Sequence, residues 1–159
     1  MDKKKLIEAI RAQLVADMTA LKEAVKATID AATNEESKAE NEYDTRGLEA
    51  SYLARGQAKR IADIEEVLLL LKHLTVRDFG PNDGISSSAV IEVEHNGKTS
   101  FFFILAKGGG VNVQFEGKSI QVVTPNSPLG EALLDQKVGG VAVVENGPQI
   151  REYDIINIW

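Results

Sequence analysis

The first 74 residues carry apolar side chains at helical spacing, in two stretches separated by a polar segment. The first stretch has apolar residues every three or four positions: Leu6, Ile7, Ile10, Leu14, Met18, Leu21, Val25 and Ile29. The second stretch repeats the pattern: Leu48, Tyr52, Ile61, Ile64, Leu68 and Leu71. Such spacing gathers apolar side chains on one helix face. It predicts helices over residues 3–33 and 37–73, paired antiparallel so that each covers the other's apolar face.

The second predicted helix has a weak middle. Gly47 and Gly56 each cost a helix roughly 1 kcal/mol relative to alanine. Arg55 or Lys59 falls close to a position where the contact between the helices requires an apolar residue. We therefore expect a stutter, or another local departure from regular packing, near these two basic residues.

From residue 75 onward apolar and polar residues alternate, which is the period of a β-strand. Strands are predicted over residues 90–94, 99–105, 111–115, 119–123, 138–145 and 151–158. Asn96-Gly97 is a strong hairpin signal, and Ser127-Pro128 is typical of the start of a helix. The expected fold class is α+β. It combines an N-terminal antiparallel helical hairpin, or coiled coil, in residues 1–74 with an antiparallel sheet and one short helix in residues 75–159.

Composition narrows the kinds of protein that fit. The chain has no cysteine and only two histidines, far apart in sequence, which disfavours disulfides, thiolate chemistry and a histidine-rich metal site. Its net charge is −6, and neither half is basic, so a stand-alone nucleic-acid binder is not expected. Acidic and basic residues interrupt the apolar positions after the N-terminal lysines, which argues against a signal peptide or a membrane span. We expect a cytoplasmic protein with no membrane partner.

The segment between the predicted helices is strongly acidic. It places five carboxylates against the single base Lys38: Glu35, Glu36, Glu40, Glu42 and Asp44. Carboxylates in the first turn of a helix are stabilised by its dipole, which explains the run without any binding role. Glu36 and Glu40 are four residues apart, with Glu35 beside them, so Glu36 and Glu40 share a helix face if the helix begins before Glu36.

Two stretches resemble the Gre-type transcription elongation factors, bacterial proteins that enter the secondary channel of RNA polymerase. Residues 123–134, which include Asn126-Ser127-Pro128, are similar to a C-terminal block of that family that continues through residues 137–140 and 153–156. Residues 38–43 are similar to the family's acidic tip motif. In one alignment Glu36 matches the first acid of the tip and Ala39 the second. An alignment shifted by one residue places Ser37 at the first acid, and both alignments stay open.

The resemblance implies an antiparallel coiled coil with an acidic tip, joined to a domain similar to the FKBP fold. It implies that this domain binds bacterial RNA polymerase, with partner contacts from Asn126, Ser127, Pro128 and Leu129. The tip would deliver the catalytic candidates Glu35, Glu36 and Glu40 to the polymerase active site. Glu36 and Glu40 would there hold Mg²⁺ shared with the polymerase. The factor would contact nascent RNA only within the polymerase complex, bind DNA only indirectly, and have no enzymatic activity alone.

Two other functions remain open from the sequence. One is an FKBP-like peptidyl-prolyl isomerase or chaperone, which needs an apolar pocket; the candidate lining residues are Phe101, Phe103, Phe115 and Trp159. The other is a coiled-coil scaffold protein. Substitution of Glu36 and Glu40 separates the polymerase factor from both of these alternatives, because only the polymerase factor requires these carboxylates.

Overall fold

The computed structural model describes residues 1–33 and 46–159. Backbone contacts divide the chain into two compact units. The globular unit is formed by Met1–Arg11 together with Leu70–Trp159, and the helical unit by Ala12–Leu69. Each long helix therefore contributes to both units. The domain boundary expected after residue 74 stays a prediction.

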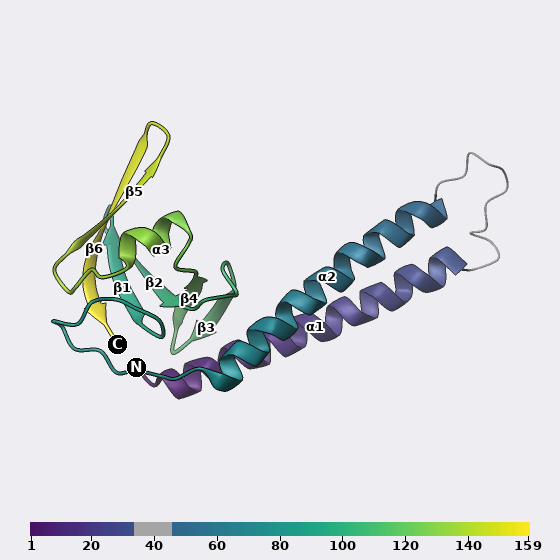
Figure 1. The fold of residues 1–159 in the computed structure, drawn as a ribbon, viewed down its shortest axis with the longest axis horizontal. Coiled ribbons are helices and arrows are strands. Elements are labelled where there is room, and N and C mark those ends of the chain that lie inside the picture. Colours follow the sequence, from purple (N-terminus) through teal and green to yellow (C-terminus); the bar gives the residue numbers. More distant parts are fainter. Residues whose placement is uncertain (34–45) are drawn as a thin grey trace. The chain divides into compact units, whose positions relative to one another are not determined.

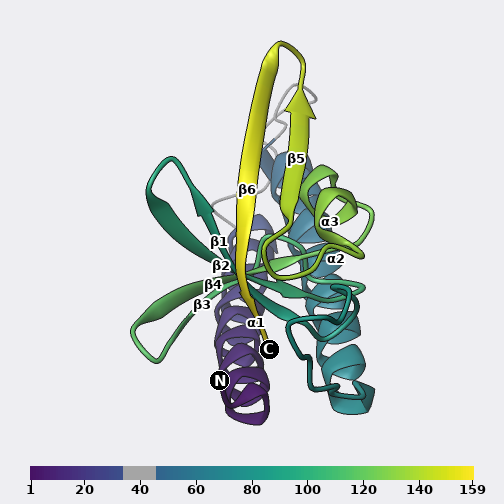
Figure 2. The same ribbon diagram turned by 90° about the vertical axis from the view of Figure 1, so that its left-hand side faces the viewer.

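The helical unit consists of most of α1 (Lys3–Thr33) and α2 (Arg46–His73). The two helices run in opposite directions, side by side (Figures 1 and 2). The bounds of α1 confirm the helix expected over residues 3–33. The first nine positions of the second predicted helix, residues 37–45, lie outside the described residues. No described helix contains an apolar stretch long enough to cross a bilayer.

Most of the less exposed side chains of the helical unit follow a heptad spacing, and Ala24 and Val67 lie next to it. On α1 they are Leu14, Met18, Leu21, Val25 and Thr28. On α2 they are Ala54, Gln57, Ile61, Ile64 and Leu68. Near Arg55 and Lys59, where a stutter or another local departure is expected, both of these side chains are exposed and the polar Gln57 takes the inward position between them. The side-chain oxygen of Gln57 is buried without a hydrogen-bond partner among the described residues.

The globular unit contains a six-stranded sheet. Its strands are β1 (Val90–His95), β2 (Lys98–Ile104), β3 (Asn112–Phe115), β4 (Lys118–Val123), β5 (Val141–Asn146) and β6 (Gln149–Ile158). Their order across the sheet is β3-β4-β2-β1-β6-β5. Every neighbouring pair is antiparallel except β2 and β4, which are parallel. The α+β class is thus confirmed, with the correction that the sheet is mixed: the chain passes through β3 before β4 and so returns in the direction of β2.

Two hairpins have the turn conformation that their sequences favour. Asn96 and Gly97 have φ values of 50° and 72°, as a type I′ turn requires. Glu116 and Gly117 adopt nearly the same pair of values, 50° and 73°. These turns fix the registers of β1 with β2 and of β3 with β4, so that His95 pairs with Lys98 and Phe115 with Lys118.

The main core of the globular unit lies between one face of the sheet and the short helix α3 (Pro128–Leu133), which contacts β5 (Figure 2). Strand residues supply most of this core, together with Ile85 and Ala89 from the segment before β1 and Leu133 from α3. The strand members are Ile91, Val93, Phe102, Ile104, Val123, Ala142, Ile155 and Ile158. This packing fixes α3 against the sheet and determines where the loop before it lies.

Lys3 is a buried charged residue at the start of α1, within the globular unit. Its ammonium group donates hydrogen bonds to the carbonyl oxygens of Arg77 and Ser88, the latter at 3.2 Å, and lies 4.8 Å from the centre of the Phe79 ring. Burial lowers the pKa of Lys3 below its usual value, and the nearby carboxylate of Asp78 opposes part of that effect. Lys3 therefore joins the first turn of α1 to the segment that precedes β1.

The substitution Lys3→Met is expected to destabilise the globular unit by about 1–3 kcal/mol, because two carbonyl groups lose their donor. Folded Lys3 holds its proton less tightly than unfolded Lys3, so the unfolded state binds more protons between the lowered pKa and the usual value of about 10.5. The stability of the wild type relative to Lys3→Met should consequently increase as pH rises through that range.

Urea denaturation between pH 7 and pH 10 tests this expectation. The fluorescence of Trp159, the single tryptophan, reports on the globular unit. Lys4→Met is the matched control, because Lys4 is exposed on the same helical turn. A difference between wild type and Lys3→Met that stays constant or decreases with pH would contradict the assignment.

Candidate partner-binding site

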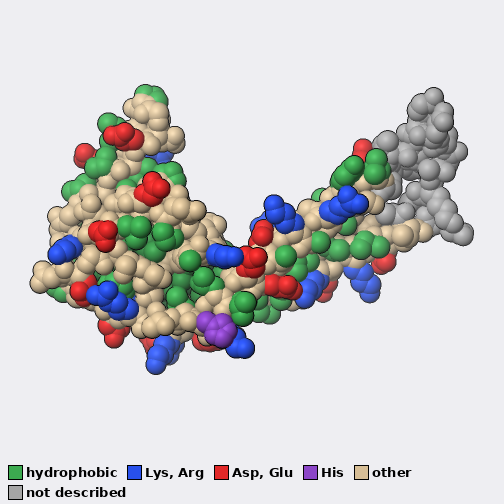
Figure 3. Space-filling model, viewed as in Figure 1, with side chains coloured by type: hydrophobic (Ala, Val, Ile, Leu, Met, Phe, Trp, Pro, Cys, Tyr) green, Lys and Arg blue, Asp and Glu red, His purple; other side chains and the backbone are tan. Residues whose placement is uncertain are grey.

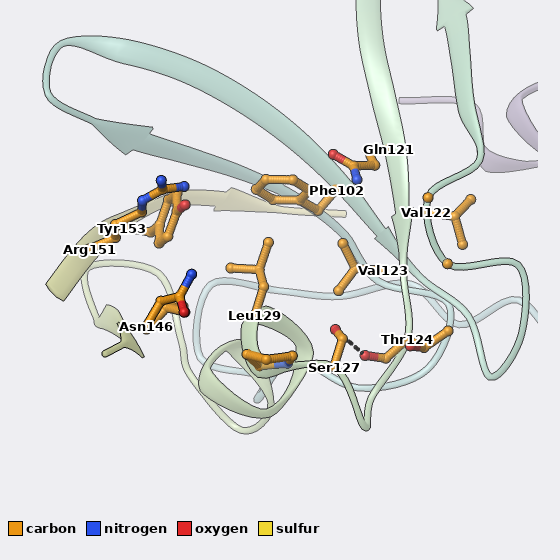
Figure 4. Close-up of a pocket in the computed structure, with 14 residues that line it drawn as sticks. Phe102, Gln121, Val122, Val123, Thr124, Ser127, Leu129, Asn146, Arg151 and Tyr153 are labelled. Atoms are coloured by element: carbon orange, nitrogen blue, oxygen red, sulfur yellow. Dashed lines mark hydrogen bonds between the residues drawn. The ribbon is translucent and has the colours of Figure 1, made fainter. Parts of the chain in front are cut away.

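The loop before α3 is fixed by Ser127, the N-cap of the helix. The hydroxyl of Ser127 accepts a hydrogen bond from the backbone N–H of Gly130 at 3.1 Å and donates one to the carbonyl oxygen of Thr124 at 2.8 Å (Figure 4). Pro128 occupies the first helical turn, where its missing N–H has no cost. The expected start of this helix is confirmed. The hydroxyl of Ser127 links the residue before the loop, Thr124, to the first turn of the helix.

Gly130 allows the loop to pass close to α3. A Cβ atom at this position would lie 1.9 Å from the carbonyl oxygen of Thr124 and 3.0 Å from Oγ of Ser127. No side chain fits in that space. The contact between α3 and the end of β4 therefore depends on the absence of a side chain at residue 130.

A cavity of about 590 Å³ opens between this loop, the sheet and the β5–β6 hairpin. Ser127, Pro128 and Leu129 line it from the α3 side. The sheet contributes residues from β2, β4, β5 and β6, and the loop before β3 adds two glycines: Phe102, Gln121, Val122, Val123, Thr124, Val144, Asn146, Arg151, Tyr153, Gly109 and Gly110. Leu129 points from α3 toward Phe102 across the cavity (Figure 4).

Aromatic side chains form one wall. The rings of Phe102 and Tyr153 meet edge to face, with centroids 6.4 Å apart and planes at 86°. Tyr153 also contacts the His95 ring at 5.0 Å. Nδ1 of His95 lies 2.7 Å from the carbonyl oxygen of Glu152. These contacts hold Tyr153 in place between the core and the mouth of the cavity, and leave a largely apolar floor.

Polar groups lie at the edges of the cavity. Gln121 lies on the β4 side, and Asn146 and Arg151 lie on the β5–β6 hairpin. Arg151 extends beside Tyr153 (Figure 4). Arg151 is the one charged residue among those lining the cavity in the described globular unit. The site therefore combines an apolar surface, amide groups and a single positive charge.

Three of the four residues expected to contact a partner, Ser127, Pro128 and Leu129, line this cavity, while Asn126 is exposed next to it. Their role in binding stays a prediction. Sequence reasoning missed Tyr153, Arg151 and Asn146. Tyr153 and Arg151 could have been found from the alternation along β6, which places residues 151, 153 and 155 on one face.

The aromatic residues considered for an isomerase pocket do not line this cavity. None of Phe101, Phe103, Phe115 and Trp159 lines the cavity, which instead uses Phe102 and Tyr153. Phe101 and Trp159 both lie near the ammonium group of Lys118, at 4.8 and 5.5 Å from the ring centres. Alternation along β2 turns Phe101 and Phe103 away from the face that Phe102 shares with the cavity.

The candidate catalytic and metal-binding residues Glu35, Glu36 and Glu40 lie outside the described residues. Within residues 1–33 and 46–159, no group of three or more histidine, aspartate or glutamate side chains is arranged to hold a metal ion. The expectation of a Mg²⁺ site at the acidic segment therefore rests on the sequence alone.

Comparison with known proteins gives no matching family model. The transcription elongation factor GreA of Mycobacterium leprae (strain Br4923) is 36% identical over 98 residues, which are 58% of this chain and 56% of the relative. GreA of Mycobacterium tuberculosis (strain ATCC 25618 / H37Rv) is 36% identical over 87 residues, covering 52% and 51%. Over these residues the chain is similar to the Gre-type transcription elongation factors. It spans about half the length of the GreA relatives that it matches.

Two solved structures show weaker similarities to this chain. Gfh1 of Thermus aquaticus is 22% identical, with 95% of this chain and 94% of that chain covered and a TM-score of 0.39. The GreA factor homolog 1 (Gfh1) of Thermus thermophilus is 19% identical, with 95% of each chain covered and a TM-score of 0.38.

Proposed function

We propose that this chain is a transcription elongation factor of Gre type that acts on bacterial RNA polymerase. The sequence identity to GreA is the observation that carries the proposal. The architecture agrees with it: two long helices enclose an acidic segment in the sequence, and the globular unit presents a cavity beside Ser127, Pro128 and Leu129. In this proposal the globular unit binds the polymerase, and the protein works in the cytoplasm.

The acidic segment would act inside the polymerase. Glu36 and Glu40, with Glu35 beside them, would help to hold Mg²⁺ at the polymerase active site. Mg²⁺ keeps several waters and takes only one or two protein carboxylates in such shared sites. A pair of carboxylates suffices to bind it in that setting. The result would be stimulated cleavage of backtracked RNA, or another change in polymerase activity, with no hydrolysis by the isolated chain.

Charge supports a protein partner rather than free nucleic acid. The chain carries 24 acidic and 18 basic residues. On the face of the globular unit shown in Figure 3, lysine and arginine side chains are scattered among acidic ones and form no continuous basic patch. Binding to bare RNA or DNA relies on several basic groups along the phosphates. We infer that nascent RNA is contacted only within the polymerase complex. The isomerase alternative is not favoured by the GreA similarity.

RNA cleavage in stalled, backtracked bacterial transcription complexes tests the proposal. Wild type should increase the cleavage rate, and Glu36→Ala/Glu40→Ala should reduce that stimulation at least about tenfold, because the metal loses its added ligands. Polymerase binding should persist, measured in parallel. The matched control is Glu23→Ala/Asp30→Ala, which removes two exposed carboxylates from α1.

The possible outcomes separate the parts of the proposal. Binding without cleavage by the wild type would identify an inhibitor or regulator instead of a cleavage factor. Equal loss in both double variants would assign the effect to overall charge instead of the two glutamates. Absence of any polymerase binding by the wild type would overturn the proposal.

A further inference from the structure

Arg151 is an unpaired cation at a largely apolar cavity. It pairs with Val144 across the β5–β6 hairpin, and Tyr153 pairs with Ala142, so both side chains project from the sheet face that carries the cavity. Residues 1–33 and 46–159 place no carboxylate in an ion pair with Arg151, and none lines the cavity. A charge in such surroundings is available to an incoming group.

The other two arginines of the globular unit are each paired with a carboxylate. The guanidinium of Arg11 lies 3.1 Å from Glu8, and that of Arg77 lies 3.3 Å from Asp83. Each is therefore neutralised within the chain. Arg151 is the exception in this unit, although the chain as a whole has an excess of acidic residues.

The rest of the cavity selects the chemistry of the occupant. Leu129, Phe102 and Val123 offer an apolar surface that a single apolar side chain would cover. Asn146 and Gln121 add hydrogen-bonding groups at the edges. One guanidinium matches one carboxylate in a bidentate pair, whereas a nucleic-acid backbone requires several cations. The combination fits a protein segment that carries an acidic residue close to an apolar one.

We propose that this cavity binds an acidic segment of RNA polymerase, with a carboxylate of the polymerase paired to Arg151 and an adjacent apolar side chain packed against Leu129 and Phe102. This inference rests on the proposed function, because it names the chemistry of the partner at the same site. Arg151 then acts as a specificity determinant: it attracts segments that carry a carboxylate and disfavours basic ones.

A charge series at residue 151 tests the inference, with binding to bacterial core RNA polymerase as the measurement. Arg151→Gln should weaken binding about three- to tenfold, Arg151→Lys less than that, and Arg151→Glu more than tenfold, because two carboxylates would then face each other. Binding by the wild type should weaken as salt is raised, and Arg151→Gln should reduce that dependence.

Lys98→Glu is the matched control. It makes the same reversal of charge on an exposed side chain of the globular unit that does not line the cavity. Its binding should stay within about twofold of wild type. Because Arg151 is exposed, the thermal midpoints of its variants should match that of the wild type, which excludes unfolding as the cause of weaker binding.

The outcomes distinguish this inference from the proposed function. If the wild type does not bind polymerase, the proposed function and the inference both fail. If the wild type binds and Arg151→Glu binds equally well, only the inference is overturned. A third arm uses a single-stranded RNA oligonucleotide: binding by the wild type that Arg151→Glu abolishes would assign the arginine to phosphate and would also overturn the pairing with a carboxylate.

Discussion

Replacement of Gly130 by alanine is expected to destabilise the globular unit by about 3 kcal/mol or more, at the upper end of overpacking effects. The new Cβ atom would lie 1.9 Å from the carbonyl oxygen of Thr124 and 2.8 Å from its carbonyl carbon. Both are backbone atoms, so no side-chain rotation relieves the contact. Either α3 or the end of β4 must therefore move. The two hydrogen bonds of the Ser127 hydroxyl, one to Thr124 and one to Gly130, join these two elements and oppose that movement.

Urea denaturation monitored by Trp159 fluorescence measures this loss. Gly56→Ala is an informative comparison, because a Cβ atom at Gly56 meets no atom within 4 Å and the residue lies in α2. It should stabilise the helix by up to about 1 kcal/mol, measured by circular dichroism at the helical band. The same chemical change thus has opposite expected signs at the two glycines. A Gly130→Ala protein as stable as wild type would show that the loop accommodates a methyl group.

Phe103→Ala is expected to cost about 3–5 kcal/mol, the usual range for a fully buried phenylalanine. Phe103 has no exposed surface, and its strand lies inside the sheet, paired with Val90 of β1 and Val122 of β4. Neighbouring strands cannot close the resulting cavity without breaking their hydrogen bonds. Because small domains have net stabilities of roughly 5–15 kcal/mol, this single change removes a large part of the total.

Phe101→Ala provides the comparison for Phe103→Ala. Phe101 lies two residues earlier on the same strand, is partly exposed, and interacts with the ammonium group of Lys118. It should cost about 1 kcal/mol, from partial burial and the cation–π contact. Denaturation midpoints from Trp159 fluorescence should therefore rank wild type, Phe101→Ala and Phe103→Ala in decreasing order. Equal midpoints for the two variants would contradict the burial difference between the two rings.

Local signals in the sequence were sufficient for most elements of the fold. The heptad spacing predicted α1 with its observed bounds, and the Asn96-Gly97 turn predicted the β1–β2 hairpin. Ser127 and Pro128 predicted the start of α3. In each case the determining interactions lie within a few residues: a helical face, a positive φ or an N-cap. Such features can be predicted from the sequence because residues close together in the chain determine them.

Features set by distant residues were not predicted. The parallel pairing of β2 with β4 depends on which strand edges are free after the hairpins form, which no local pattern specifies. The two aromatic residues that line the cavity were not predicted. Phe102 is on β2 and Tyr153 is on β6, and they come together because both strands pair with β1. Gln57 was overlooked as an inward-facing residue because it is polar.

The globular unit is discontinuous along the chain, since Met1–Arg11 and Leu70–Trp159 build it together. In the order of the chain, the segment that forms the helical unit therefore stands between the two parts of the globular unit, and its length can change separately from theirs. Removal or addition of one heptad in each helix would preserve the regular packing and change the length of the helical unit by about 10 Å. No substitution in the globular unit would be needed. Paired insertions or deletions of seven residues are therefore the changes in length that the helical unit can accept while its heptad packing is kept.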